Sequence, residues 1–191
     1  MSAQLHCGHM DTSEVELPGR RTRRRHEPEF RARVVGACGQ PGVSVAAVAL
    51  ANGLNENKVT FNRLLGLRVL RLRPQMQVGF AMRPELVGHY HYQRLHGGVI
   101  SATLDALGGS ALLVAIIDQH PNEPAEVAMA RFVKLGTIDL RVDYLRPGLG
   151  KHFTATAEIT RLGGRVGSTQ CRLHNDEGVL IATAAAAYIV S

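Results

Sequence analysis

The sequence predicts an α+β fold in which one long central helix is wrapped by an antiparallel sheet. Three observations support this: an apolar segment at residues 98–117, alternation of apolar and polar residues in the segments around it, and glycine-containing turns between those segments. A segment that is apolar on nearly every side has to be buried as a helix. Alternation with a period of two is typical of a strand with one covered face.

Size and composition predict one domain with an appendage. The chain has 191 residues, of which 45% are hydrophobic, and this excludes collagen, bulk disorder and a disulfide scaffold. The longest apolar stretches, 111–117 and 179–190, are shorter than the roughly 18–20 residues that span a bilayer. The first residues lack an apolar signal region, so we expect a cytoplasmic protein without a membrane contact. Three cysteines without CxxC spacing predict free thiols, with no metal site and no cofactor.

Charge and composition divide the chain near residue 58. The net charge is +6, and residues 20–33 contain seven arginines against two glutamates. Such a cluster is suited to phosphate backbones, and a solvated basic arm without a partner is the alternative. We expect a basic, helix-turn-helix-like extension over residues 1–58 and the central-helix domain over residues 59–191.

The N-terminal segment has the layout of a DNA-binding helix-turn-helix. Pro28 can begin a helix, Ser44 can cap a second one, and Asn52-Gly53 can form the turn after it. The segment 23–59, with EFRARVV and PGVSVAAVALANGLN, resembles the N-terminal DNA-binding region of insertion-sequence transposases, which implies binding to transposon ends. The chain has no tryptophan and changes character after Val59, so a fused or vestigial fragment, folded or disordered, is the alternative.

The elements of the second segment follow from its pattern. We expect a short helix at 61–65, strands near 67–72 and 77–82, a loop, the long helix, and strands near 136–145, 153–160, 166–174 and 179–190. Gly163-Gly164 and residues 175–178 supply hairpin turns. In the strand TIDLRVDY, residues Ile138, Leu140, Val142 and Tyr144 share one face, which we expect to be covered.

Asp105 is the single charged residue in the apolar segment 98–117. A lone buried carboxylate is costly unless it is paired or hydrogen-bonded. A salt bridge to a distant arginine such as Arg141 is the structural interpretation. The functional interpretation is a carboxylate that lines a cleft and acts as a base or nucleophile. Ser101, one turn earlier on the same face, is then a candidate substrate contact.

His96-Gly97-Gly98 stands at the start of the long helix. Two glycines there let a ligand approach the backbone, and the free N–H groups attract developing negative charge, as an oxyanion site requires. Glycines that only make the turn are the alternative. Gly97 and Asp105 are eight residues apart, about 12 Å along a helix, too far to serve one carbonyl. The sequence therefore predicts a site shared across a two-fold dimer.

Several motifs carry a resemblance to a known family. FNRLLGL, the HGG motif with an aspartate nine residues after its histidine, DYLRPG and the final ATAAAAYIV make residues 61–191 similar to hotdog-fold acyl-CoA thioesterases of the phenylacetyl-CoA thioesterase-like group. The resemblance implies hydrolysis of the thioester between an acyl group and coenzyme A without a metal. It implies that Asp105 is the catalytic carboxylate, that the Gly97 N–H polarises the carbonyl, and that His96 orients the loop.

One position departs from the family pattern. Members usually carry an asparagine six or seven residues before HGG, which holds the attacking water; here His89 or Tyr90 stands in its place. Coenzyme A carries phosphates, so cations are expected near the site. The candidates, which are otherwise ordinary solvated arginines, are Arg146, Arg161 and Arg165. The acyl pocket is expected from residues that are equally suited to a core: Leu64, Val87, Leu104 and Leu112.

The expected function is hydrolysis of medium-chain or aromatic acyl-CoA by a homodimer or homotetramer, because pairing edge strands between subunits removes exposed sheet edges. Two alternatives remain: a non-catalytic acyl-CoA-binding hotdog protein, and a DNA-binding regulator that uses the hotdog domain as a sensor.

Overall fold

The computed structural model describes residues 56–120, 122, 127 and 134–190. The expected helix-turn-helix over 23–59 lies outside these residues, except for 56–59, which belong to the start of a described helix. The expected division of the chain at residue 58 stays a prediction. In chain order the elements are α3 (Glu56–Leu65), β1 (Arg68–Arg71), β2 (Gln77–Ala81), the 3-10 helix η1 (Pro84–Leu86), β3 (Val87–His89), β4 (Arg94–Leu95), α4 (Gly97–Gln119), β5 (Gly136–Tyr144), β6 (His152–Leu162), β7 (Val166–Asn175) and β8 (Leu180–Ile189).

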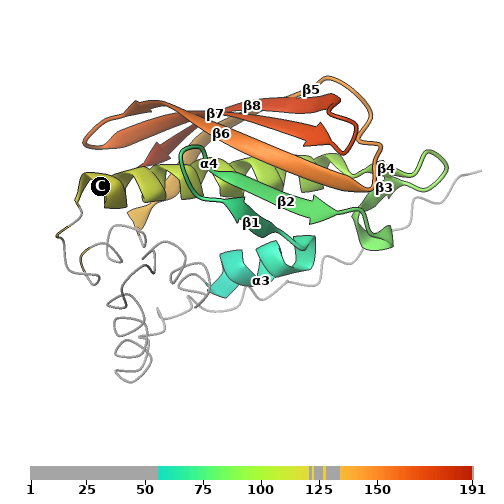
Figure 1. Ribbon diagram of the computed structural model, residues 1–191, viewed down its shortest axis with the longest axis horizontal. Helices are drawn as coiled ribbons and strands as arrows, with labels where there is room; N and C mark the ends of the chain where they lie inside the picture. Colours follow the sequence, from blue (N-terminus) through green and yellow to red (C-terminus); the bar gives the residue numbers. More distant parts are fainter. Residues whose placement is uncertain (1–55, 121, 123–126, 128–133, 191) are drawn as a thin grey trace, which may run out of the picture.

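Six strands form one antiparallel sheet in the order β1-β2-β6-β7-β8-β5. Figure 1 shows this sheet lying over the long helix α4, with α3 below β1 and the β3–β4 hairpin beside the start of α4. This is the predicted hotdog arrangement, and the fold class is confirmed. The hairpin turns expected at 163–164 and 175–178 join β6 to β7 and β7 to β8. The strands β3 and β4 were not predicted, because three and two residues are too few for a periodic pattern.

Helix α4 forms the core of the fold. It begins after His96, which caps it, and ends at His120, directly before a proline that cannot continue a helix. By length and composition alone, its 23 residues are enough to cross a membrane, which corrects the expectation drawn from the shorter apolar stretches. However, 61% of its most apolar 18-residue window is buried inside the fold, as is typical of a core helix.

Strand β8 lets α4 approach the sheet closely. Its inward positions Ala184 and Ala186 are small, and Tyr188 is the large buried side chain of this face. Gly108 and Gly109 lie opposite Tyr188 on α4, because a Cβ at Gly108 would be 2.4 Å from Tyr188 Oη. Small residues on the strand and on the helix therefore interlock around one tyrosine.

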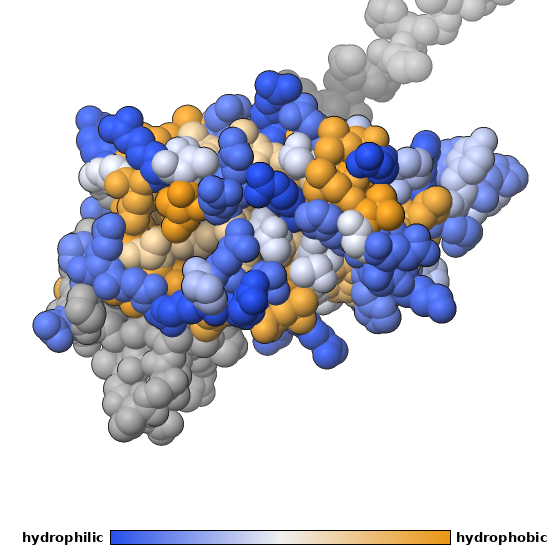
Figure 2. Space-filling view, turned by 45° about the horizontal axis from the view of Figure 1, so that its top comes forward, coloured by the Kyte–Doolittle hydropathy of each residue, from blue (hydrophilic) through white to orange (hydrophobic). Residues whose placement is uncertain are grey.

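Strand β5 forms one edge of the sheet and differs from the predicted pattern. Leu140 and Val142 are half-buried, whereas Ile138 is 54% and Tyr144 is 55% exposed. The register shifts between Thr137 and Asp139, which leaves Ile138 out of the pairing with β8 and breaks the alternation. The view of Figure 2, which brings the upper side of Figure 1 forward, shows hydrophobic residues gathered in patches among hydrophilic ones.

Candidate active site

The first turn of α4 leaves one backbone donor available. His96 is in extended backbone conformation (φ −65°, ψ 135°), and its Nδ1 accepts a hydrogen bond from the Gly98 N–H at 2.9 Å. Within the described part of the chain, no acceptor is found for the Gly97 N–H. Because a helix N-terminus favours negative charge, this N–H is suited to an oxyanion.

Two neighbouring elements hold this turn in place. The Tyr144 hydroxyl at the end of β5 donates to the Gly97 carbonyl at 3.1 Å. On the other side, the His96 N–H donates to the Leu86 carbonyl at 2.8 Å. A Cβ at Gly88 would lie 2.5 Å from His96 Cα, so β3 can approach this closely only with glycine at that position. The start of α4 is therefore fixed by β5 on one side and by η1 and β3 on the other.

His89 ends β3 beside this turn. Its ring lies 4.7 Å from the ring of Tyr92, between centroids, and its Nδ1 is buried without a hydrogen-bond partner among the described residues. A buried polar atom normally has a partner, so this nitrogen is available to a water molecule or a ligand. Tyr90, the other residue at the position of the family asparagine, is 72% exposed.

Asp105 lies in the third turn of α4 and is half-buried. Thr137 Oγ1, at the start of β5, donates to its carboxylate at 2.8 Å. Arg141, the alternative partner considered above, instead pairs with Asp143 at 3.1 Å. Gly98 and Ser101 lie within about 60° of Asp105 around the helix, and none of the three is buried. The carboxylate therefore belongs to a face of α4 that solvent or a partner can reach.

The backbone below Asp105 is held from the sheet. The Tyr188 hydroxyl donates to the Asp105 carbonyl at 3.0 Å, across 83 residues of chain. Burial, with a contribution from the Asp105 charge, raises the pKa of Tyr188, so the hydroxyl keeps its proton. Thr169 Oγ1 lies beside it, because a Cβ at Gly108 would be 2.7 Å from that atom. This buried polar group fixes the helix at the level of the carboxylate.

Gly97 and Asp105 lie on one continuous helix, eight positions apart. Regular helical geometry separates them by about 12 Å along the axis. The structure therefore brings Asp105 together with Thr137, and His96 and Gly97 together with Tyr144, as two candidate half-sites of one chain.

The three candidate arginines do not form one cluster. Arg161 and Arg165 lie at the β6–β7 hairpin, at the end of the sheet where Val166 pairs with Ile189 and Ile189 with Gly136. Arg146 follows the opposite end of β5 and donates to the Leu180 carbonyl at 3.1 Å. All three side chains are exposed, so each stays a candidate for a phosphate by itself.

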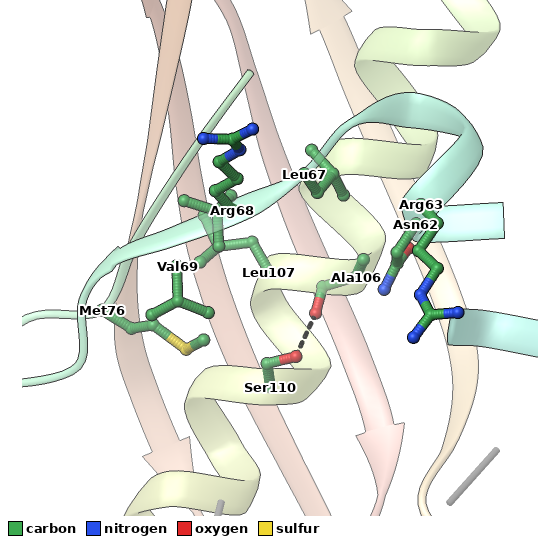
Figure 3. Close-up of a pocket in the computed structure, with 10 residues that line it drawn as sticks. Asn62, Arg63, Leu67, Arg68, Val69, Met76, Ala106, Leu107 and Ser110 are labelled. Atoms are coloured by element: carbon green, nitrogen blue, oxygen red, sulfur yellow. Dashed lines mark hydrogen bonds between the residues drawn. The ribbon is translucent and has the colours of Figure 1, made fainter. Parts of the chain in front are cut away.

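A pocket of about 300 Å³ opens beside α4. Figure 3 shows side chains of α3, β1 and α4 around it, with Ala106 and Ser110 on the helix. Its lining differs from the expected acyl pocket, since Leu104 and Leu112 are fully buried in the core and Leu64 is exposed. The residues that line it are Asn62, Arg63, Leu67, Arg68, Val69, Met76, Val78, Ala106, Leu107 and Ser110.

Among the described residues, no group of three histidine, cysteine or acidic side chains could hold a metal ion. Cys171 is a free, buried thiol, in agreement with the prediction for that residue. Burial raises the pKa of Cys171 to about 11. The thiol is therefore protonated near neutral pH and is unsuited to act as a nucleophile.

Comparison with known proteins agrees with this architecture. The family model described as Thioesterase superfamily matches residues 92–182. The medium/long-chain acyl-CoA thioesterase YigI of Escherichia coli K12 is 40% identical over 131 residues, which are 68% of this chain and 84% of YigI. The chain belongs to the thioesterase superfamily.

Solved structures of this superfamily share the fold. A thioesterase-superfamily protein from Shewanella oneidensis is 38% identical, with a TM-score of 0.69 over 77% of this chain and 98% of that protein. A protein from Syntrophus aciditrophicus is 36% identical, with a TM-score of 0.64 over 75% of this chain and 95% of that one.

Three residues that contact Asp105 or Gly97 in this thioesterase-superfamily chain were not predicted from the sequence. Thr137, Tyr144 and Tyr188 hold Asp105 or Gly97 through contacts across 32, 47 and 83 residues. The pattern of the sequence placed Tyr144 on a covered face and gave no pairing between strand and helix. Only the register of β5 and β8 against α4 identifies them.

Proposed function

We propose that the protein is an acyl-CoA thioesterase that hydrolyses the thioester of a medium-chain or longer acyl-CoA. The observation that carries the proposal is the Asp105 carboxylate, held by Thr137 on the accessible face of α4. The similarity to YigI, whose name gives medium- and long-chain acyl-CoA as its substrates, supports the same class. An aromatic acyl group is the alternative substrate.

In this mechanism Asp105 is the base for water or the nucleophile itself. As a base, it takes a proton from water while the hydroxide attacks the thioester carbon. The carbonyl oxygen becomes an oxyanion, which the Gly97 N–H at the helix terminus stabilises. The C–S bond then breaks, coenzyme A leaves as the thiolate and takes up the proton, and the acyl group is released as the acid. As a nucleophile, the Asp105 carboxylate attacks the thioester carbon, the C–S bond breaks, and coenzyme A leaves as the thiolate, which gives a mixed anhydride. Water then hydrolyses the anhydride, which frees the acid, restores the Asp105 carboxylate and supplies the proton that the thiolate takes up.

The two groups meet if two copies pair through β5. Thr137 beside Asp105 and Tyr144 beside Gly97 lie at opposite ends of this edge strand. When two such strands pair antiparallel about a two-fold axis, the start of one lies opposite the end of the other. Gly97 of the partner then approaches Asp105. The exposed apolar residues of β5, Ile138 among them, support an interface at this edge.

His89 replaces the family asparagine in this proposal. Its buried Nδ1 without a partner among the described residues could hold the attacking water near the start of α4. We propose that exposed arginines contact the phosphates of coenzyme A. The candidates are Arg146 at one end of the sheet, and Arg161 and Arg165 at the other. Gly98 and Ser101 are proposed to line the path of the thioester between the half-sites.

The test is the release of free thiol from acyl-CoA esters. Asp105→Asn keeps the shape and removes the charge, so we expect kcat to fall by about 10²–10⁴-fold. Asp118→Asn, at the far end of α4, is the matched control and should stay near the wild-type rate. Binding of acyl-CoA without hydrolysis by the wild type would favour the non-catalytic hotdog alternative.

A DNA-binding role for residues 20–59 is a second candidate, which the seven arginines of 20–33 favour. A salt-dependent gel shift that is lost on deletion of residues 1–58 would support it, and the transposase-like interpretation with it. The expected cytoplasmic location and the choice between dimer and tetramer also stay predictions.

A further inference from the structure

The β3–β4 hairpin carries four aromatic rings at its tip. Residues 89–94, His-Tyr-His-Tyr-Gln-Arg, include no aliphatic and no acidic side chain. Tyr90 is 72% and Tyr92 is 65% exposed, although a tyrosine ring usually buries most of its apolar surface. The hairpin projects from the fold beside the start of α4 (Figure 1). Of these residues the mechanism uses only His89, so the other rings are free to contact a ligand.

The rings form one connected cluster. Tyr90 lies 4.0 Å from His91, between ring centroids, and 6.0 Å from His89, with the planes of the latter pair at 10°. Tyr92 lies 4.7 Å from His89, and the Arg94 guanidinium lies 5.5 Å from the centroid of Tyr92. Exposed rings stack on the flat face of a base, and a neighbouring cation attracts phosphates. A nucleotide, which combines a base with phosphates, is therefore complementary to this cluster.

Hydrogen bonds within the tip hold it in shape. The Tyr92 N–H donates to the His89 carbonyl at 3.2 Å, and the Gln93 side chain donates to the Tyr90 carbonyl. Gln93 has a positive φ of 48°, which is uncommon for a residue other than glycine. Such a conformation persists where the surrounding contacts determine it. The turn therefore presents the rings in a fixed arrangement, which reduces the entropy lost when a ligand binds.

The tip lies close to the start of α4. Arg94 is two residues before His96, at most about 7 Å along the chain, and pairs with His89, which directly precedes Tyr90. In an acyl-CoA ester, the extended pantetheine arm and diphosphate separate the adenine from the thioester by more than this distance. A substrate with its carbonyl at the Gly97 N–H can therefore reach the tip with its nucleotide.

We propose that the ring cluster of residues 89–94 binds the nucleotide end of acyl-CoA, an inference that rests on the proposed function. The adenine stacks on Tyr90, and Arg94 lies beside the phosphates. Arg146 is placed to act with Arg94, because the Leu95 N–H of β4 donates at 2.9 Å to the carbonyl of Gly148, two residues after Arg146. Among the three arginines proposed for the phosphates, Arg146 is the one held beside this hairpin.

The experiment compares two substrates with the same acyl group: octanoyl-CoA, and octanoyl-pantetheine, which lacks the nucleotide. The ratio kcat/KM is measured for the wild type, Tyr90→Ala, Tyr90→Phe and Arg94→Gln. Phe61→Ala is the matched control, because Phe61 is also an exposed ring, at 48%, but lies on α3. Affinity of the full chain for free coenzyme A and for ADP is measured by calorimetry, which does not depend on hydrolysis.

We expect Tyr90→Ala to lose at least about fivefold in kcat/KM for octanoyl-CoA, as the loss of a stacked ring does, and no more than about twofold for octanoyl-pantetheine. Its affinity for free coenzyme A should fall by the same factor as kcat/KM for octanoyl-CoA. Tyr90→Phe keeps the ring and should behave as the wild type, as should Phe61→Ala. Arg94→Gln should show the same selective loss, and that loss should shrink as salt screens the phosphates.

Equal losses with both substrates would overturn the inference, because they would assign Tyr90 to the thioester site or to the folding of the hairpin. Unchanged kcat/KM of Tyr90→Ala for octanoyl-CoA would overturn it as well, even if the affinity for ADP fell. A wild type that hydrolyses neither substrate would contradict the proposed function instead. The affinities of the wild type and of Tyr90→Ala for free coenzyme A would then still decide whether the rings bind the nucleotide.

Discussion

Asp105 depends on residues that lie far from it in the sequence. Its carboxylate accepts a hydrogen bond from Thr137, and its own carbonyl accepts one from Tyr188. The motif HGG with an aspartate nine residues after the histidine was sufficient to predict Asp105, Gly97 and His96 as site residues from the sequence. Thr137 and Tyr188 could not be found in that way, because a propensity or a spacing does not state which strand residue lies opposite which helix turn.

Thr137→Val should lower kcat about tenfold with little change in KM. The substitution keeps the branched shape and removes the hydroxyl that orients the carboxylate, and a hydrogen bond to a charged group is worth about 1.5 kcal/mol or more. Steady-state kinetics on one acyl-CoA ester measures the effect. Thr137→Ser should restore most of the rate, and Thr156→Val on β6 is the control. A rate for Thr137→Val equal to wild type would show that this contact does not orient Asp105.

Helix α4 and strand β8 illustrate what periodicity can and cannot predict about elements. Both were predicted from the sequence, since one is apolar on nearly every side and the other is an apolar run after the turn at 175–178. Ile138 on β5 was predicted to be covered, which is wrong, because a register shift near Thr137 breaks the alternation. No pattern in the sequence indicates that shift. The close approach of Gly108 to Tyr188 also depends on the packing of the two elements.

Gly108→Ala should destabilise the fold by about 1–3 kcal/mol, as overpacking of a core does. The new Cβ would lie 2.4 Å from Tyr188 Oη and 2.7 Å from Thr169 Oγ1. Urea unfolding measures the change. Gly164→Ala is the control, because a Cβ there meets nothing within 4 Å, and Tyr188→Phe in the Gly108→Ala background should recover part of the loss. Equal stability of Gly108→Ala and wild type would contradict the described packing.

At the scale of the whole molecule, each chain carries the two proposed half-sites about 12 Å apart along α4. Asp105 with Thr137 forms one, and Gly97 with His96 and Tyr144 forms the other. The sequence predicted this separation correctly, because a helix converts residue number directly into length. It could not show that the two half-sites lie at the two ends of one edge strand. Because they do, pairing two copies through β5 would bring Asp105 of one copy toward Gly97 of the other.

The most direct test of the shared site is complementation between two inactive variants. Asp105→Asn removes the carboxylate, and Gly97→Pro removes the N–H. Proline fits at this first helical position, since His96 before it is already extended and a Cβ at Gly97 would lie 3.5 Å from Tyr144. When the two variants are mixed, unfolded and refolded together, half of the dimers are mixed, and one of the two sites in each carries both groups. The account predicts that thiol release returns to about a quarter of the wild-type rate. A refolded, dimeric mixture that stays as inactive as either variant alone would contradict it.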